Sequence, residues 1–359
     1  MKVLTVVGAR PQFIKAAAVS RALRPSHDEV LVHTGQHYDA RMSQVFFDEL
    51  GMDEPDVNLS IGSGSHAAQT AQMLEPLEAL MLQHRPDIVL VYGDTNSTLA
   101  GGLAAAKLNI PVAHVEAGLR SFDRTMPEEI NRVVVDHLAQ LLLCPTDLAV
   151  RNLAAEGITA GVSQVGDVML DTARRMAVTA SASDFPQTLG VSRGQYFLAT
   201  VHRAATSDDP QRLSAVISAF AKLPAPVVWP VHPRTSGNMR TFGLDRLVQD
   251  ERNIIVVSPT SYAETNALLQ GARALLTDSG GMQKEAYFLG VPCITLRDTT
   301  EWVETVDLGW NLLVGTDTDA IVAAACDPAR RPDRRPEVYG DGHAAEKIVE
   351  QLEMFTAAL

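Results

Sequence analysis

Residues 275–286 read Leu-Leu-Thr-Asp-Ser-Gly-Gly-Met-Gln-Lys-Glu-Ala. The apolar run 274–277 predicts a buried parallel strand, and the pattern after it predicts a helix that ends at Gly290. Gly280 and Gly281 lack Cβ atoms, so a ligand could approach the backbone closely where the helix begins. The free N–H groups and the dipole of a helix start favour an anion, so this turn predicts a phosphate or pyrophosphate site.

The stretch 275–286 has two possible interpretations, a nucleotide-binding site and an ordinary turn between a strand and a helix. Glu285 lies one to two turns into the helix, where its carboxylate could accept hydrogen bonds from a ribose diol. The plainer interpretation is a tight turn between strand and helix, in which Asp278 or Ser279 caps the helix. The stretch alone leaves both open.

Strand-like apolar runs alternate with helical patterns along the whole chain. In the first half the runs are 3–7, 30–34, 88–92, 112–115, 141–144 and 162–165, and in the second half 196–200, 227–230, 254–257, 274–277, 293–296 and 311–314. Continuous apolar runs are typical of strands covered on both faces, hence of parallel sheets with helices on each side. The sequence therefore predicts an α/β fold with two Rossmann-like domains facing across a cleft.

The expected domains are 1–167 and 168–342, with a last helix in 343–359 that packs back on the first domain. Segment 180–193 is expected to be a linker-like insertion, and 328–342, which is rich in Pro, Arg and Asp, a surface loop.

Composition narrows the class of protein. A chain of 359 residues is long enough for two domains, and 46% hydrophobic with 20% charged residues is typical of a soluble globular protein. A net charge of −13 argues against a nucleic-acid or membrane-surface binder, so an anionic ligand would need a local basic cluster. No apolar run approaches the ~20 residues of a membrane span. The three cysteines have neither metal-ligand nor disulfide spacing, which fits a cytoplasmic protein without a metal.

Ligands of open α/β sheets bind beyond the carboxyl ends of the strands, so polar residues there carry the most information. The first such segment, 8–15, reads Gly-Ala-Arg-Pro-Gln-Phe-Ile-Lys. It is neither a dinucleotide fingerprint nor a Walker loop. Arg10 and Lys15 could face an anion there, although Lys15 could also be a solvated helix residue.

Three carboxylates in the first half are candidates for acid–base chemistry. Asp94 follows the run 88–92, Glu116 follows 112–115, and Glu128 stands at the start of a predicted helix. Each has a structural alternative: Asp94 could cap a helix, Glu116 could pair with Arg120, and Glu128 could be there because the helix dipole favours acidic residues.

In the second half, His and Arg residues follow two predicted strands, as His202-Arg203 and as His232-Pro233-Arg234. They could neutralise a diphosphate, or one or two of them could be surface residues. Together with the glycine turn they form a predicted anion cradle: His202, Arg203, Ser279, Gly280 and Gly281. Carboxylates from one domain and an anion cradle from the other suggest a nucleotide-sugar enzyme.

An ordered set of motifs carries a family resemblance. The motifs are Gly8-Ala9-Arg10-Pro11-Gln12, Thr34-Gly35-Gln36-His37, Gly93-Asp94-Thr95, His114-Val115-Glu116-Ala117-Gly118-Leu119-Arg120, Pro127-Glu128-Glu129-Ile130-Asn131-Arg132, Asp278-Ser279-Gly280-Gly281 and Arg297-Asp298-Thr299-Thr300-Glu301. Over nearly the whole chain they resemble the non-hydrolysing UDP-N-acetylglucosamine 2-epimerases. The resemblance implies the glycosyltransferase-B architecture.

The resemblance also implies a reaction and its residues. UDP-N-acetylglucosamine (UDP-GlcNAc) and UDP-N-acetylmannosamine (UDP-ManNAc) would interconvert by elimination of UDP to a 2-acetamidoglucal and re-addition, with no metal or redox cofactor. Asp94, Glu116 and Glu128 would be the acid–base carboxylates, and His202 would contact the diphosphate and aid UDP departure. The remaining implied contacts are Arg10 and Lys15 in the active site, Ser279, Gly280 and Gly281 on the phosphates, and Glu285 on the ribose. A cytoplasmic homodimer is the implied assembly.

Two departures from the family pattern concern the substrate and regulation. Trp302 stands where an active-site Arg is expected, which makes the chain similar to a branch acting on UDP-2,3-diacetamido-2,3-dideoxy-glucuronic acid. Some members bind a second UDP-GlcNAc as an activator; Gln36 and His37 match their motif, but Asp39 and Gln72 replace the expected Gln and Arg.

Other functions stay open at this point. A glycosyltransferase of the same fold would need an acceptor and no chemistry at C2. A non-catalytic UDP-sugar sensor would tolerate loss of the three carboxylates. Hydrolysing relatives of the family would release free UDP.

Overall fold

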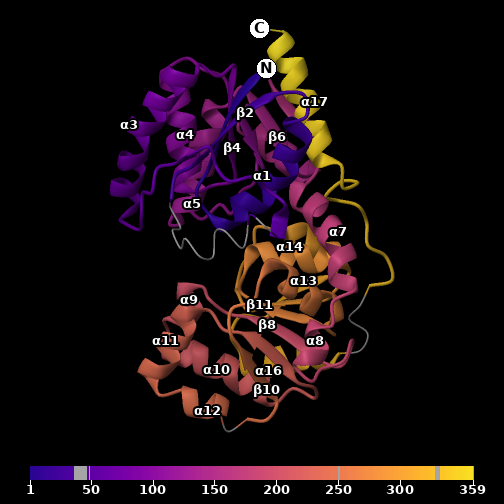
Figure 1. Cartoon of the computed structure of the whole chain (residues 1–359). Coiled ribbons are helices and arrows are strands. Elements are labelled where there is room, and N and C mark those ends of the chain that lie inside the picture. The colour runs from indigo at the N-terminus through magenta and orange to yellow at the C-terminus, as the bar shows by residue number, and fades with distance from the viewer. Residues whose placement is uncertain (36–46, 48, 250, 328–331, 359) are drawn as a thin grey trace. The chain divides into compact units, whose positions relative to one another are not determined.

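A computed structural model describes residues 1–35, 47, 49–249, 251–327 and 332–358, with the backbone alone at Arg10 and Thr179. The chain divides into two compact units (Figure 1). Unit 1 comprises Met1–Thr172 and Glu337–Leu359, and unit 2 comprises Ala173–Pro336. The sequence placed this boundary at 167/168; in the structure it falls inside helix α7 (Val168–Ser181).

Unit 1 is built on a seven-stranded parallel sheet with strand order β3-β2-β1-β4-β5-β6-β7. Its strands are β1 (Lys2–Val7), β2 (Asp28–His33), β3 (Val57–Asn58), β4 (Ile88–Tyr92), β5 (Val112–Val115), β6 (Leu141–Cys144) and β7 (Val162–Gln164). Strands β4, β5 and β6 are buried at every position, because helices cover both faces of the sheet.

The helices of unit 1 form two layers (Figure 1). On one face α3 (His66–His84), α4 (Asn96–Lys107) and α5 (Pro127–Leu138) pack side by side. On the other face α1 (Arg10–Leu23) packs against the last helix, α17 (Ala344–Ala357), while α6 (Asp147–Ala155) packs on β6 and β7. Helix α17 is held at its far end by His27 Nε2, which lies 2.8 Å from Glu353 Oε1.

Unit 2 repeats the plan with a six-stranded parallel sheet, ordered β10-β9-β8-β11-β12-β13. The strands are β8 (Phe197–Thr200), β9 (Val227–Pro230), β10 (Ile254–Val257), β11 (Leu275–Thr277), β12 (Cys293–Thr295) and β13 (Asn311–Leu313). The helices are α8 (Phe185–Thr188), α9 (Ala204–Ser207), α10 (Pro210–Ala221), α11 (Pro233–Phe242), α12 (Asp245–Gln249), α13 (Tyr262–Gly271), α14 (Gly280–Leu289), α15 (Val303–Asp307) and α16 (Thr318–Cys326). Two apolar clusters flank the sheet, around Trp229 and around Tyr196.

The predicted α/β fold with two parallel sheets is confirmed. Every predicted run is a strand whose ends shift by at most two residues. Strand β3 was not predicted, because it has only two residues and neither is buried. Segment 180–193 is more ordered than a linker, since it contains α8 and places Val191 in the core.

Strand order explains where functional residues gather. In each sheet the first strand of the unit, β1 or β8, lies inside the sheet. The next two strands are added on one side of it, and the chain then crosses over and adds the remaining strands on its other side. The loops after the two central strands diverge at such a switch point and leave a crevice at the carboxyl edge. The predicted site residues follow β1, β4 and β5 in unit 1, and β8 and β11 in unit 2.

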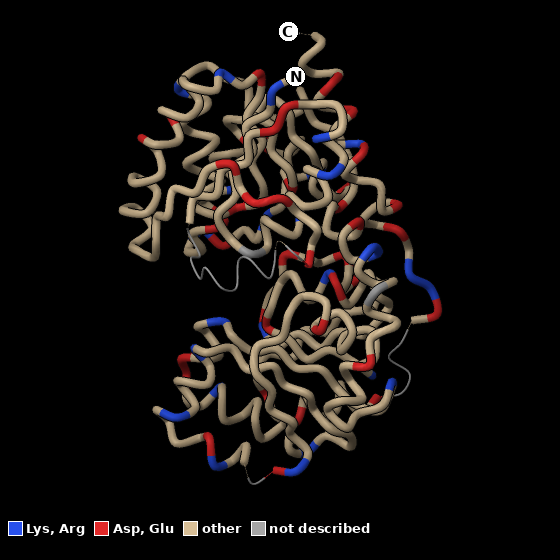
Figure 2. The backbone as a smooth tube through the Cα atoms, in the orientation of Figure 1, with Lys and Arg blue, Asp and Glu red and all other residues tan. Residues whose placement is uncertain are grey.

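Acidic and basic residues are interspersed along the backbone of both units (Figure 2). Of the helices in the described part of the chain, none combines the length and the apolar character needed to cross a membrane.

Candidate active site

The glycine turn of unit 2 joins β11 to α14. Ser279 is the N-cap of α14: its Oγ accepts a hydrogen bond from the Met282 N–H at 3.4 Å, and its own N–H donates to Thr277 Oγ1 at 2.9 Å. Gly280 and Gly281 form the first turn. A Cβ atom at Gly280 would lie 2.4 Å from Glu301 Oε1, so the turn has no room for a side chain. The plainer interpretation of this stretch, a capped helix start, therefore holds for Ser279, and the open backbone suits an anion as well.

Asp278 ties this turn to the loop after β8. Its carboxylate is fully buried and accepts hydrogen bonds from the backbone N–H groups of His202 (2.9 Å) and Arg203 (2.8 Å). The His202 side chain is 42% exposed, and its Nδ1 lies 3.5 Å from Asp278 Oδ1. Asp278 is thus not the helix cap; it brings the predicted cradle residues His202, Arg203 and Ser279 together.

Two arginines converge on Glu301 beside the glycine turn. Arg203 Nη2 lies 3.7 Å from Glu301 Oε1, and Arg297 Nη2 lies 3.1 Å from Oε2. Burial by itself would raise the pKa of Glu301, but the positive charges of Arg297 and Arg203 outweigh it and lower that pKa. With the buried Asp278 carboxylate, which accepts from the Arg203 N–H, two arginines and two carboxylates lie around this turn.

Trp302 and Lys284 occupy the buried wall behind this cradle. Trp302 is 5% exposed and Lys284 is 1% exposed, and the Lys284 ammonium lies 4.0 Å from the centroid of the Trp302 ring. This is cation–π geometry. A positive charge therefore lies against Trp302, on α14 next to Glu285, which is itself buried. Arg234, by contrast, is engaged elsewhere, because Asp208 accepts hydrogen bonds from its guanidinium.

In unit 1, Lys15 and Glu116 form a buried ion pair. Lys15 Nζ lies 2.7 Å from Glu116 Oε1, and the two side chains are 7% and 10% exposed. Lys15 is therefore not a solvated helix residue, and Glu116 does not take Arg120 as its ion-pair partner. Glu116 has a φ of +72°, a backbone conformation that costs a non-glycine residue on the order of 1–3 kcal/mol and is common at functional sites.

Arg120 instead joins a buried cluster below Glu116. Its guanidinium donates to Asp136 at 2.7 Å and to both carboxylate oxygens of Glu156. Asp136 also accepts from His114 at 2.7 Å. Burial would raise the pKa of Asp136, but His114 and Arg120 outweigh that effect and lower it. None of His114, Asp136 and Glu156 was singled out as a candidate by sequence reasoning, because no local spacing signals that they meet.

Asp94 pairs with Arg132 rather than capping a helix. The Arg132 guanidinium donates to the Asp94 carboxylate, and Asn131 Nδ2 donates to the Asp94 carbonyl at 2.9 Å. The N-cap of the following helix is Thr95, whose side chain accepts from Thr98 N. The interpretation of Asp94 as a helix cap was therefore wrong, because the next residue, Thr95, caps the helix.

The third predicted carboxylate, Glu128, is not joined to the other two. It is exposed near the start of α5, and in the described parts of the chain no hydrogen bond or ion pair links it to Asp94 or Glu116. Its neighbour Glu129 is buried and accepts from the N–H groups of Ser121 and Phe122. Glu128 and Arg132 lie on the same helix, α5, and Arg132 binds Asp94. Within the described residues, the link between Glu128 and Asp94 is therefore the backbone of that helix.

Some predicted residues lie outside what the structure describes. These are the side chain of Arg10 and the residues Gln36, His37 and Asp39, while Gln72 is an exposed residue of α3. Gln12 belongs to the first motif, 8–12, but the sequence alone offered no reason to assign it a role. Its amide accepts from Gly8 N (2.8 Å) and donates to the Tyr92 carbonyl (2.8 Å), which fixes the loop after β1 to the end of β4.

Metal and thiol chemistry find no support among the described residues. They contain no group of three or more His, Cys, Asp or Glu that could hold a metal ion. Burial raises the pKa of the Cys144 thiol to about 12, so Cys144 is a core residue and a poor nucleophile.

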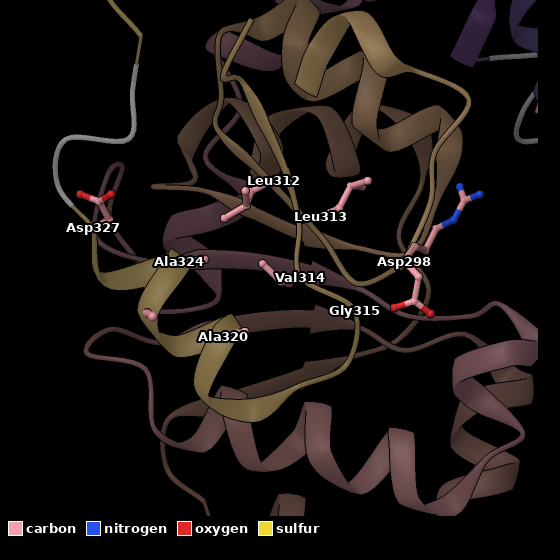
Figure 3. A pocket seen from close by; sticks show the side chains of 10 residues that line it. Asp298, Leu312, Leu313, Val314, Gly315, Ala320, Ala324 and Asp327 are labelled. Carbon is pink, nitrogen blue, oxygen red and sulfur yellow. The ribbon is translucent and has the colours of Figure 1, made fainter. Parts of the chain in front are cut away.

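Unit 2 contains a cavity of about 620 Å³ (Figure 3). Arg297, which contacts Glu301 beside the glycine turn, is one of the residues that line it. Asp298, the segment 312–315, helix α16 and Asp327 supply the other lining residues. None of the predicted site residues lines it, so we do not assign the candidate chemistry to this cavity.

The two sets of groups are suited to different tasks. In unit 1, ionised carboxylates are held by buried cations at strand ends, which suits proton transfer. In unit 2, a helix start, open backbone N–H groups and converging arginines suit a phosphorylated ligand.

Comparison with known proteins identifies the family. Residues 21–353 match the family model described as UDP-N-acetylglucosamine 2-epimerase. A Methanococcus maripaludis protein named UDP-N-acetylglucosamine 2-epimerase homolog is 49% identical, over 98% of this chain and 99% of its own length. The UDP-2,3-diacetamido-2,3-dideoxy-D-glucuronate 2-epimerase of Pseudomonas aeruginosa is 48% identical over 98% of this chain and 99% of its own.

Solved structures agree. The crystal structure of Methanocaldococcus jannaschii UDP-GlcNAc 2-epimerase in complex with UDP-GlcNAc and UDP superposes with a TM-score of 0.90 at 40% identity, covering 99% of this chain and 100% of that one. The calicheamicin glycosyltransferase, at 14% identity and a TM-score of 0.59, shares the fold alone, which supports a glycosyltransferase-B architecture. The chain therefore belongs to the UDP-N-acetylglucosamine 2-epimerase family and is an isomerase of the epimerase class.

Proposed function

We propose that the enzyme interconverts UDP-GlcNAc and UDP-ManNAc by eliminating UDP and adding it back, without hydrolysis. The observation that carries this proposal is the Lys15–Glu116 pair, a carboxylate at a strand end held 2.7 Å from a buried ammonium. Such a carboxylate is positioned for proton transfer, which epimerisation requires and simple binding does not.

In the first half of the reaction, a carboxylate removes the C2 proton as the bond between C1 and the diphosphate oxygen breaks. The electrons of the C2–H bond form the C1=C2 double bond of the 2-acetamidoglucal, and those of the C1–O bond leave with UDP. In the second half, UDP adds back to C1 and a proton is delivered to the opposite face of C2. Asp94, Glu116 and Glu128 are the proposed acid–base groups.

Departure of UDP needs stabilisation of the negative charge that develops on the diphosphate. We assign this to the cradle of unit 2. The N–H groups at the start of α14 and the partly exposed His202 and Arg203 would contact the phosphates, and Glu285 the ribose. Arg10 and Lys15 are the proposed active-site cations of unit 1.

A second substrate has a specific observation in its favour. Trp302 and Lys284 form a buried cation–π pair where the resemblance led us to expect an arginine. A relative named for UDP-2,3-diacetamido-2,3-dideoxy-D-glucuronate is 48% identical to this chain, level with the 49% of the relative named UDP-N-acetylglucosamine 2-epimerase homolog and above the 40% of one named UDP-N-acetylglucosamine 2-epimerase. The uronic acid sugar is therefore our second candidate, with the same chemistry at C2.

Proton NMR in D₂O with no acceptor tests both candidates. The purified enzyme is incubated with UDP-GlcNAc in one tube and with the diacetamido-uronic acid sugar in another. Deuterium at C2 together with the signal of the epimer, in either tube, would establish the epimerase and its substrate. Exchange in neither tube would contradict the proposal and favour a glycosyltransferase or a UDP-sugar sensor, whereas free UDP accumulating with free sugar would indicate a hydrolysing enzyme.

We further propose a homodimer that works in the cytoplasm. The family resemblance supports the dimer, and two buried cysteines that form no disulfide, Cys144 and Cys293, are compatible with a reducing compartment. Light scattering of the purified protein tests the first point: a mass near that of one 38.7 kDa chain would contradict it. Fractionation of cells tests the second.

A further inference from the structure

His114 is a fully buried histidine in the middle of the unit 1 sheet, and both of its ring nitrogens meet oxygen atoms. Nδ1 lies 2.7 Å from Asp136 Oδ1, and Nε2 lies 2.7 Å from the carbonyl oxygen of Gly93. A backbone carbonyl can only accept a hydrogen bond, so Nε2 carries a proton. The Asp136 carboxylate lies 2.7 Å from the permanently charged Arg120 guanidinium and also accepts from the Gly118 N–H, an environment that holds a carboxylate ionised, so it accepts from Nδ1 too and Nδ1 carries a proton as well.

The ring is therefore an imidazolium inside a charge-balanced cluster. The partners of Asp136 are all donors: His114, the Arg120 guanidinium at 2.7 Å and the Gly118 N–H at 3.1 Å. Glu156 supplies the second negative charge, by accepting from Arg120. Two cations and two anions are thus buried or half-buried together, an arrangement in which removing one member leaves its partner uncompensated.

The position of His114 matters because its contacts join the three segments that carry the proposed acid–base groups. Its Nε2 holds Gly93, the residue before Asp94. Its own strand, β5, ends at the next residue, and Glu116 follows directly. Its Nδ1 holds Asp136, which lies on α5, the helix that begins beside Glu128.

The Gly93 contact lies closest to the Lys15–Glu116 pair. Gly93 has a φ of +61°, and a Cβ atom there would lie 3.2 Å from Lys15 Nζ and 3.6 Å from Glu116 Oε1. A shift of the Gly93 carbonyl would therefore move Asp94 relative to the Lys15–Glu116 pair. Displacements of about 1 Å at reacting groups can cost about 100-fold in rate.

We propose that His114 is a positioning residue of the epimerase: a buried imidazolium that fixes the Gly93–Asp94 turn, Glu116 and helix α5 in one geometry. This inference rests on the proposed function, because it concerns the rate of proton transfer at C2. His114 itself touches no substrate in this account.

The first test is the His114→Gln variant. A glutamine amide can replace one of the two ring N–H donors but not both, and it carries no charge. We expect kcat for C2 exchange to fall about 10- to 100-fold, while the Kd for UDP measured by calorimetry changes less than about threefold, because the proposed diphosphate contacts lie in unit 2.

A matched control separates positioning from loss of stability. Met81→Ala removes a fully buried side chain at the far end of α3 and makes no change near the carboxylates. It should lower the thermal midpoint at least as much as His114→Gln does, yet leave kcat within about twofold of the wild type. Equal losses of kcat in the two variants would overturn the positioning role.

The second test needs no variant. In protein labelled with ¹⁵N-histidine, the NMR signal of His114 should show a proton on both ring nitrogens at the working pH of the enzyme. One unprotonated nitrogen would overturn the imidazolium assignment, even if His114→Gln fails to fold. A wild type that exchanges no C2 proton with either sugar would overturn the proposed function and this inference together, whereas an active wild type and an equally active His114→Gln would overturn this inference alone.

Discussion

Lys15 Nζ lies 2.7 Å from Glu116 Oε1, although the two residues are 101 positions apart in the chain. Lys15 stands in α1, which follows the central strand β1, and Glu116 follows β5, two strands away. Parallel strands end at the same edge of a sheet, so both residues reach the carboxyl edge, where they form a nearly dry ion pair. Replacing either residue should lower the free energy of unfolding strongly, because the charge of the remaining partner would stay buried and uncompensated.

Lys15→Met should therefore destabilise unit 1 by about 3 kcal/mol and reduce turnover about 100-fold. Urea unfolding and the C2 exchange assay measure the two effects. The matched control is Lys2→Met, because Lys2 pairs with Asp28 at 3.6 Å on the surface and should contribute less than about 1 kcal/mol. Equal stability of the two variants would contradict the importance of the buried pair.

Glu116→Gln keeps the shape of the side chain and removes its ability to take a proton. We expect C2 exchange to fall about 10²- to 10⁴-fold, the usual contribution of general acid–base catalysis, with little change in the Kd for UDP. Glu353→Gln, on the exposed side of α17, should leave both unchanged. Unchanged exchange in Glu116→Gln would remove Glu116 from the mechanism.

Gly280→Ala should weaken UDP binding about tenfold. The added methyl group would lie 2.4 Å from Glu301 Oε1, and Glu301 cannot move freely because Arg297 and Arg203 hold it. Gly237→Ala is the control: Gly237 is inside α11 with no atom within 4 Å of an added Cβ, so this change should stabilise the helix by up to about 1 kcal/mol and leave the Kd for UDP unchanged. Calorimetric titration of both variants with UDP makes the comparison, and equal affinities would show that the glycine turn does not contact the phosphates.

Asp171 should make folding stability depend on pH. Burial raises its pKa from 3.8 to about 6; hydrogen bonds from Ala345 and Ala344 act in the opposite direction, and Glu346 and Asp167 add to the rise. The folded state then holds the proton more tightly than the unfolded state, so stability is highest below about pH 4 for this group and falls as pH rises to about 6. At neutral pH the penalty is on the order of 2–3 kcal/mol.

The variant Asp171→Asn keeps an acceptor for the Ala345 N–H and is neutral at every pH. Its thermal midpoint should exceed that of the wild type at pH 7, and the difference should vanish near pH 4. Asp319→Asn, at an exposed aspartate, should leave the pH dependence as it is. A wild-type and an Asp171→Asn profile with the same slope between about pH 4 and pH 6 would contradict the assignment.

Much of the fold and part of the site could be predicted from local sequence. Runs such as 88–92 and 141–144 are apolar at every position, and only strands covered on both faces need that pattern, so the two parallel sheets followed directly. The helix start at Ser279, Gly280 and Gly281 could be predicted because it is signalled by residues adjacent in the chain, while the role of these residues in binding a phosphate stays a prediction. The small β3 escaped because two residues carry no periodicity.

The partners of the charged groups could not be predicted in the same way. Asp94 and Glu116 were predicted as acid–base groups, but their ion-pair partners were not: Asp94 binds Arg132, 38 residues away, where capping was the alternative, and Glu116 binds Lys15, where Arg120 was the alternative. His114 belongs to one of the quoted motifs, but no local pattern indicated its partners, since its two contacts are 21 and 22 residues distant.

The sequence by itself determined most of the secondary structure, the α/β class and the positions at which polar residues follow buried strands, because hydrophobic periodicity and helix capping act over a few neighbouring residues. Only the tertiary structure decided which ions meet. Ion pairing depends on distances of a few ångströms between side chains, and those distances are set by strand order and helix packing, which bring residues from distant parts of the chain to one edge of the sheet.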